Sequence, residues 1–224
     1  MQETTGGFGI RVRQAVLRPE NAYVVASKSG KMTKEILHEW IKFGYYDSIE
    51  NLPASLLIVD SWTAFKDFDG MDQNIPTGHE FSTAIIPEGT TFLVQTLDVY
   101  GFRLIKAFMR RISDWVLMYS IDVQLFQRNN VIKMVSLTHN QFHCPRFENM
   151  WKYSWFKARY MDERPLEFQT PAHHCFATFT AFNLCCYCAE PAFIRCAWCK
   201  TLLCFRGFWG GAEQFGHYCE HFLE

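Results

Sequence analysis

The chain has 224 residues, of which 49% are hydrophobic and 20% are charged. This composition excludes a disordered or collagen-like protein, and the length suits one medium domain or a domain with a small appendage. A formal net charge of −1 excludes global basicity as a route to nucleic acid, so any DNA contact has to come from local patches. No apolar run reaches the length of a membrane span, and we expect no membrane partner.

The first hundred residues alternate predicted strands with helices, which indicates an α/β class. Short apolar runs predict strands at residues 22–26, 55–60 and 81–86. Between the first two, Thr33 is expected to cap a helix that continues to about Phe43, with Gly44 as its stop. The second strand ends in an acid, Asp60, at the edge where open α/β sheets keep their sites.

A long amphipathic helix is predicted from about Asp98 to Tyr119. Its expected buried stripe consists of Val99, Phe102, Ile105, Met109, Ile112 and Val116. Off that stripe lie Arg103, Lys106, Arg110 and Arg111. This modest basic face is either a solvated surface or a place of DNA contact.

Two further helices are expected, at about residues 130–141 and after Pro145, where proline favours a first turn. The second is expected to bury a face that includes Phe147, Met150 and Trp155. We divide the chain into residues 1–125, a helical extension at 126–180 and a cysteine-rich tail at 181–224.

Two carboxylates, Asp60 and Asp98, are the candidate catalytic and metal-binding acids of the first part. Carboxylates at strand ends suit a hard ion such as Mg²⁺ or Mn²⁺, which can polarise a phosphate and activate a nucleophile. On spacing alone the signal is weak, because Asp98 is also placed to stabilise a helix N-terminus through the helix dipole.

Three segments strengthen that interpretation because they occur in a recognisable order. They are Ala26 to Thr33, Leu56 to Asp60, and Ile86 to Val99. This arrangement resembles the DDE superfamily endonuclease domain of the pogo/jerky-like transposases, over roughly residues 22–120. The resemblance implies a ribonuclease-H-like fold in which three acids hold Mg²⁺ for DNA cleavage and joining. Asp60 matches the second acid and Asp98 the third.

The chain also departs from that family. Only 26 residues precede Ser27, and none of them forms an apolar strand followed by the first acid. The expected N-terminal helix-turn-helix region is absent, and Thr96 replaces the usual proline before the third acid. We therefore expect a truncated, partial ribonuclease-H-like sheet with flanking helices. The corresponding function is a nuclear, transposase-derived DNA-binding or DNA-processing protein that is catalytically inactive.

A second constellation lies in the C-terminal tail, where Cys-x-x-Cys pairs with further Cys and His predict structural zinc. One complete site is expected from Cys196, Cys199, His217 and Cys219. A second is expected to start from Cys185, Cys188 and Cys204, with Cys186 or His221 as possible substitutes for a fourth ligand and Gly207 where a histidine would be convenient. The arrangement resembles the RING-like tails of some transposase-derived proteins. Reduced cysteines buried as small hydrophobes are the alternative.

Nine cysteines without a signal peptide indicate a reducing, intracellular setting. The alternative function is a non-enzymatic module, in which the zinc tail contacts protein or DNA and the α/β part is a scaffold. A ubiquitin-ligase role of the tail is a more distant third hypothesis.

Overall fold

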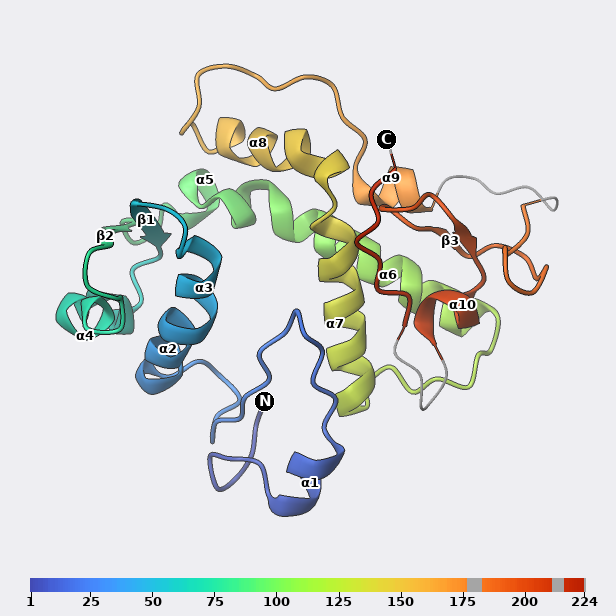
Figure 1. Cartoon of the computed structure of the whole chain (residues 1–224), viewed down its shortest axis with the longest axis horizontal. Helices are drawn as coiled ribbons and strands as arrows, with labels where there is room; N and C mark the ends of the chain where they lie inside the picture. Colours follow the sequence, from blue (N-terminus) through green and yellow to red (C-terminus); the bar gives the residue numbers. More distant parts are fainter. Residues whose placement is uncertain (177–182, 211–215, 224) are drawn as a thin grey trace. The chain divides into compact units, whose positions relative to one another are not determined.

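The computed structural model describes residues 1–176, 183–210 and 216–223 (Figure 1). The chain forms two compact units. Unit 1 contains Met1–Val16 and Tyr23–Val99, and unit 2 contains Leu17–Ala22 and Tyr100–Glu224. The division at residues 125 and 180 that the sequence led us to expect stays a prediction.

The first part of the chain contains short elements. In order they are α1 (Ile10–Ala15), α2 (Lys34–Trp40), the π-helix η1 (Ile41–Tyr45), α3 (Tyr46–Ile49), β1 (Ala54–Val59), the 3₁₀ helix η2 (Thr63–Lys66), α4 (Phe68–Asp72), β2 (Glu80–Ile85), α5 (Thr91–Val94) and the π-helix η3 (Leu97–Gly101). A small core of Leu37, Ile41, Ala64 and Met71 holds α2 and η1 to the segment that connects the two strands.

The sheet of unit 1 consists of β1 and β2, which pair in parallel from Ala54 opposite Glu80 to Val59 opposite Ile85. Both strands and the α/β class were predicted. The third predicted strand, at residues 22–26, is wrong. Near this segment the structure has only an isolated bridge between Ser27 and Gln2. Residues 22–26 form no strand because a strand requires a continuous hydrogen-bonded partner. Two strands do not establish a ribonuclease-H-like sheet, which stays a proposal.

The start of α2 confirms the predicted cap, because the Thr33 hydroxyl accepts a hydrogen bond from the Ile36 amide at 3.3 Å. The predicted stop at Gly44 is wrong, since the chain continues through η1 and α3 to Ile49. A Cβ at Gly44 would lie 2.9 Å from Cδ1 of Trp40. Gly44 therefore does not end the helix. Its missing side chain leaves room for the indole ring of Trp40 to lie against the helix.

Unit 2 is built on longer helices. Its elements are α6 (Phe102–Met118), α7 (Arg128–Phe142), the 3₁₀ helix η4 (Pro145–Phe147), α8 (Glu148–Lys157), α9 (Pro171–Cys175), β3 (Ile194–Arg195), β4 (Leu202–Leu203) and α10 (Phe205–Trp209). In Figure 1 the orange-to-red segment with β3 and α10 lies beside α6 and α7, and its Phe193 and Ile194 share their core.

The buried face of α6 differs from the predicted stripe. Leu104, Phe108, Ile112 and Val116 point into the core, at a constant spacing of four residues. Ile112 and Val116 were predicted correctly, but Phe102 is 39% exposed. The apolar pattern of α6 allows two neighbouring faces, and packing against α7, α9 and the cysteine-rich segment selects one of them.

The two helices expected after α6 are present as α7 and α8, and Pro145 begins the 3₁₀ turn that leads into α8. Met150 and Phe147 are buried as predicted, whereas Trp155 is 40% exposed. Among the described residues, no helix combines the length and the apolar character that crossing a membrane requires.

Candidate metal centres in the C-terminal unit

The first cysteine pair, Cys185 and Cys188, lies on a tight backbone turn. The amide of Cys185 donates to the carbonyl of Glu190 at 2.7 Å, and the amide of Ala189 donates back to the carbonyl of Cys185 at 3.1 Å. Ala189 adopts a left-handed conformation with φ of 56°. The turn brings the backbone around so that both sulfur atoms point to one side.

The second pair, Cys196 and Cys199, repeats this turn. The amide of Cys196 donates to the carbonyl of Thr201 at 2.9 Å, and the amide of Lys200 donates to the carbonyl of Cys196 at 3.1 Å. Lys200 has φ of 59°, close to the value at the equivalent position of the first turn. We call these two turns the knuckles. Their identical hydrogen bonding shows that the two Cys-x-x-Cys sequences fold in the same way.

A short antiparallel ribbon joins the knuckles to each other. Strand β3 pairs with β4 through Ile194 opposite Leu203, and the amide of Cys186 donates to the carbonyl of Leu202 at 3.0 Å. The ribbon places Cys204, directly after β4, next to the first knuckle, although Cys204 lies beyond the second one in the sequence.

The complete centre consists of Cys196, Cys199, His217 and Cys219, whose ligand atoms all lie within 4.8 Å of one another. The Cys199 Sγ atom is 3.6 Å from Nε2 of His217. A sulfur at 2.3 Å and a nitrogen at about 2.0 Å from one tetrahedral zinc ion would be separated by about 3.5 Å. These are the four residues expected from the sequence. Their ligation of an ion stays a prediction.

The three-cysteine centre consists of Cys185, Cys188 and Cys204, whose sulfur atoms also lie within 4.8 Å of one another. The sulfurs of Cys188 and Cys204 are 3.5 Å apart, near the value of about 3.8 Å for two thiolates on one tetrahedral zinc ion. Neither Cys186 nor His221 joins this group. Within the described part of the chain, the centre has no fourth ligand.

The pKa values of the cysteine and histidine side chains in the two centres are shifted in different directions. Burial raises the pKa of Cys196 to about 12 and that of Cys204 to about 11. Burial also opposes ionisation of Cys185, but hydrogen bonds with the backbones of Cys204 and Tyr187 and with Cys188 outweigh it and lower the Cys185 pKa to about 7. Burial lowers the pKa of His217, which keeps the imidazole neutral and able to coordinate. The clustered thiols can ionise together only if a cation compensates their charge.

Side chains of α7 hold the second knuckle in place. The buried Gln141 accepts a hydrogen bond from the Ala197 amide at 2.7 Å and donates one to the sulfur of Cys196 at 3.8 Å. The Trp198 indole donates to the carbonyl of Asn140 at 2.8 Å. Sequence reasoning missed these supports, because a glutamine in a helix carries no signal of a distant metal ligand.

Residues 17–22, which are far from the metal ligands in the sequence, support the segment that carries His217 and Cys219. Asn21 donates to the carbonyl of Ser136 on α7 at 3.0 Å and accepts a hydrogen bond from the Ser136 hydroxyl. The hydroxyl of Tyr218, which lies between the ligands His217 and Cys219, donates to the same Ser136 oxygen at 2.8 Å. This network was not predicted, and it ties residues 17–22 to the metal-ligand segment.

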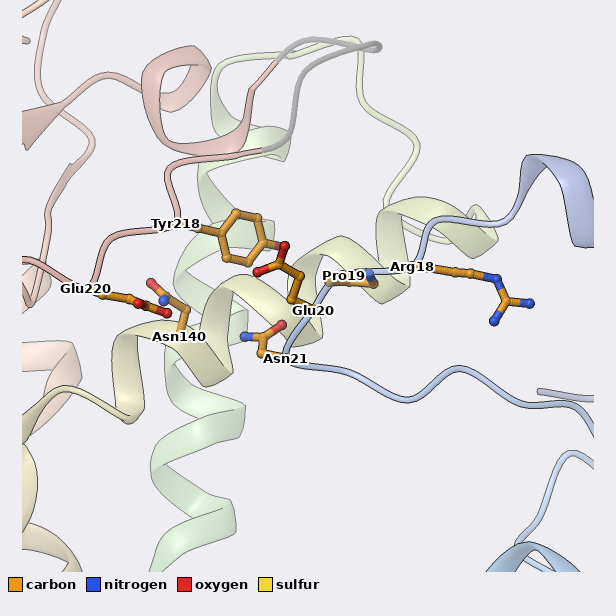
Figure 2. A pocket seen from close by; sticks show the side chains of 7 residues that line it. All are labelled: Arg18, Pro19, Glu20, Asn21, Asn140, Tyr218 and Glu220. Atoms are coloured by element: carbon orange, nitrogen blue, oxygen red, sulfur yellow. The ribbon is translucent and has the colours of Figure 1, made fainter. Parts of the chain in front are cut away.

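A cavity of about 320 Å³ lies beside this network. It is lined by Arg18, Pro19, Glu20, Asn21, Asn140, Tyr218 and Glu220. Figure 2 shows these residues coming from the N-terminal segment, from α7 and from the C-terminal segment, with the Arg18 side chain pointing away from the others. The cavity carries carboxylates and amides, so it does not favour phosphate.

The two acids of unit 1 have ordinary structural surroundings. Asp60 follows β1, and its Oδ1 accepts a hydrogen bond from the Trp62 amide at 3.0 Å. Asp98 is exposed in the first turn of η3. Neither belongs to a group of three or more potential metal ligands among the described residues. Their pairing around Mg²⁺ has no support here and stays a prediction.

One comparison with known families bears on the C-terminal region. Residues 155–219 match the family described as the Tc5 transposase C-terminal domain. The matched region contains all seven cysteine and histidine side chains of the two centres, and it supports a transposase-derived origin. Asp60 and Asp98 lie outside the matched residues, so the match carries no information about these two acids. Comparisons with curated proteins and with solved structures gave no match.

Proposed function

We propose that this chain is a transposase-derived DNA-binding protein whose C-terminal unit is stabilised by zinc. The observation that carries the proposal is the coincidence of the Tc5-type region with the two ligand groups. A location in the nucleus and protein contacts through the cysteine-rich tail belong to the same proposal.

Zinc suits the ligand atoms present. Thiolates and a neutral imidazole are the ligands that zinc prefers, and four protein ligands on one ion characterise structural sites. The complete centre offers such a set, and its Cys196 is fully buried within the core of unit 2. Zinc bound there would cross-link β3 and the chain around residues 217–219 without supplying reaction chemistry.

The surface that we propose for DNA is the basic face of α6. Arg103, Lys106, Arg110 and Arg111 are all exposed; the first three lie on the side of α6 away from its buried residues, and Arg111 lies at the flank of that buried face. Lys106, Arg110 and Arg111 form no ion pair with any described residue. Their charges are therefore available to phosphates, which provide most of the affinity in sequence-independent DNA binding.

Charge reversal tests this assignment. We expect Lys106→Glu combined with Arg110→Glu to weaken binding to a DNA duplex by tenfold or more. The slope of log affinity against log salt should become shallower by about one for each lost phosphate contact. Fluorescence anisotropy over a salt series measures both quantities. Lys42→Glu combined with Lys66→Glu is the matched control, because it reverses two exposed charges, on η1 and η2 in unit 1. Equal affinity of the double variant and the native chain would contradict the assignment.

The endonuclease hypothesis has its own test. The carboxylates Asp60 and Asp98 are the residues on which it depends, and we expect no metal-dependent nicking because neither belongs to a group of three or more potential metal ligands among the described residues. Supercoiled plasmid incubated with Mg²⁺ or Mn²⁺ provides the measurement. Nicking that disappears in both Asp60→Ala and Asp98→Ala would show that the chain is an active enzyme and would contradict the expected inactivity.

A further inference from the structure

We propose that the three-cysteine centre is an open zinc site that takes an external nitrogen ligand of the imidazole class at its fourth position. The proposal rests on the zinc-binding part of the function proposed above. The site consists of Cys185, Cys188 and Cys204, and the backbone of Gly207 lies next to the sulfurs of Cys185 and Cys204.

The first argument is the comparison with the complete centre. Both centres are built on the same knuckle, and both add a cysteine from a later segment, Cys204 in one and Cys219 in the other. What the complete centre has in addition is His217. An imidazole on the three-cysteine centre would therefore give it the same set of three sulfurs and one nitrogen, with the same net charge.

The second argument is the place of Gly207. Its amide donates a hydrogen bond to the sulfur of Cys204 at 3.2 Å, so the backbone lies against the sulfur cluster. A Cβ at this position would lie 3.5 Å from the Cys204 sulfur and 3.6 Å from the Cys185 sulfur, which is ordinary van der Waals contact. The position next to the sulfurs of Cys185 and Cys204 is thus occupied by the one residue type that brings no side chain.

The third argument is access. Cys188 is exposed, and Tyr187 within the same knuckle is 70% exposed. Cys185 and Cys204 are buried on the inner side of the cluster. A small ligand can therefore approach from the side of Cys188. In the complete centre, by contrast, the fourth position is occupied by His217.

The experiment uses the full chain loaded with Co²⁺, whose visible absorption reports the ligands of each tetrahedral site. We expect two cobalt ions per chain, and we expect added imidazole to change the spectrum of one of them in a saturable way. Gly207→His should show the altered spectrum without imidazole, should no longer respond to it, and should hold its second ion at least tenfold more tightly. Gly207→Ala is the matched control, because its methyl group fits and offers no ligand, so the response to imidazole should remain.

Several results would overturn the proposal. A native spectrum that imidazole leaves unchanged would show that four ligands are already bound. Loss of the second ion in Cys186→Ser or His221→Ala would show that one of these side chains is the missing ligand. If Gly207→His fails to fold, the imidazole titration of the native chain decides alone. Two firmly bound ions without any response to imidazole would refute only the open site, whereas failure to bind any metal would refute the zinc-binding function as well.

Discussion

The two metal centres of this chain begin alike and end differently. Each begins with a knuckle of the same hydrogen bonding, yet one gathers four ligands, of which only Cys196 is buried, while the other gathers three, of which only Cys188 is exposed. The difference shows that a Cys-x-x-Cys turn does not by itself define a role. The role depends on which ligands the later segments add.

The two centres also differ in how they are hydrogen-bonded to the rest of unit 2. The complete centre is held by Gln141 and Asn140 of α7 on one side and by Tyr218 on the other. The three-cysteine centre is held by backbone amides, that of Cys186 bonding to the β3–β4 ribbon and that of Gly207 in α10 bonding to the sulfur of Cys204. We therefore expect the first centre to determine the stability of unit 2, and the second to respond to solutes.

The largest difference should come from removing one sulfur from each centre. We expect Cys196→Ser to lose its ion and to reduce the free energy of unfolding by more than about 4 kcal/mol, because a structural metal and a buried core position are lost together. Cys188→Ser should lose only the second ion, at a cost below about 2 kcal/mol. Denaturant unfolding and elemental analysis measure these effects.

The control for this pair is Cys186→Ser, which changes an exposed cysteine outside both ligand groups. It should keep two ions and stay within about 0.5 kcal/mol of the native chain. Equal losses in Cys196→Ser and Cys188→Ser would remove the distinction between a structural centre and an open one.

Metal removal should separate the centres in time. A chelator such as EDTA should extract the ion of the three-cysteine centre first, because that ion has fewer protein ligands and an exposed sulfur. A zinc indicator dye should record two phases of release, and the melting temperature should fall mainly in the second. A single phase would mean that the two ions are held as one unit.

A smaller effect on stability is expected from removing the hydrogen bond between Tyr218 and Ser136, next to the complete centre. Tyr218→Phe removes the donor to the Ser136 hydroxyl, which should cost about 1 kcal/mol and accelerate release of the ion held by His217 and Cys219 severalfold. Tyr187→Phe is the matched control, since this exposed tyrosine lies in the other knuckle. Identical release kinetics in both variants would show that the network does not support the ligands.

The smallest difference concerns protons. Because burial raises the pKa of Cys196 to about 12, this thiol keeps its proton near pH 7 until a metal displaces it. Zinc affinity should therefore increase with pH at both centres. The number of protons released per ion should differ little between the centres, since hydrogen bonds that outweigh burial lower the pKa of one thiol in each, Cys185 to about 7 and Cys199, while burial raises the pKa of Cys204 as well as that of Cys196. Calorimetry in buffers of different ionisation enthalpy counts the protons.

The sequence predicted those features that local chemistry determines. The Thr33 cap, the strands β1 and β2 and the two Cys-x-x-Cys pairs all follow from residue types at short spacing. Features that depend on distant packing were missed. The face of α6 is selected by the elements that cover it, and Gly44 serves the Trp40 ring.

The same limit applies to the site. Gln141 and Asn21 approach the metal-ligand segments only through the tertiary fold, so no sequence pattern indicates them. The two acids show the opposite case, in which a resemblance names Asp60 and Asp98 but neither belongs to a group of three or more potential ligands among the described residues.

The order of the ligands along the chain has a further consequence. Cys204 of one centre falls between Cys199 and His217 of the other, so the two ligand sets overlap in sequence. With both ions bound, a protease that cuts between Cys199 and Cys204 would leave fragments bridged twice by metal. Such a nicked protein would migrate as one species in native gels and as two after chelation and denaturation.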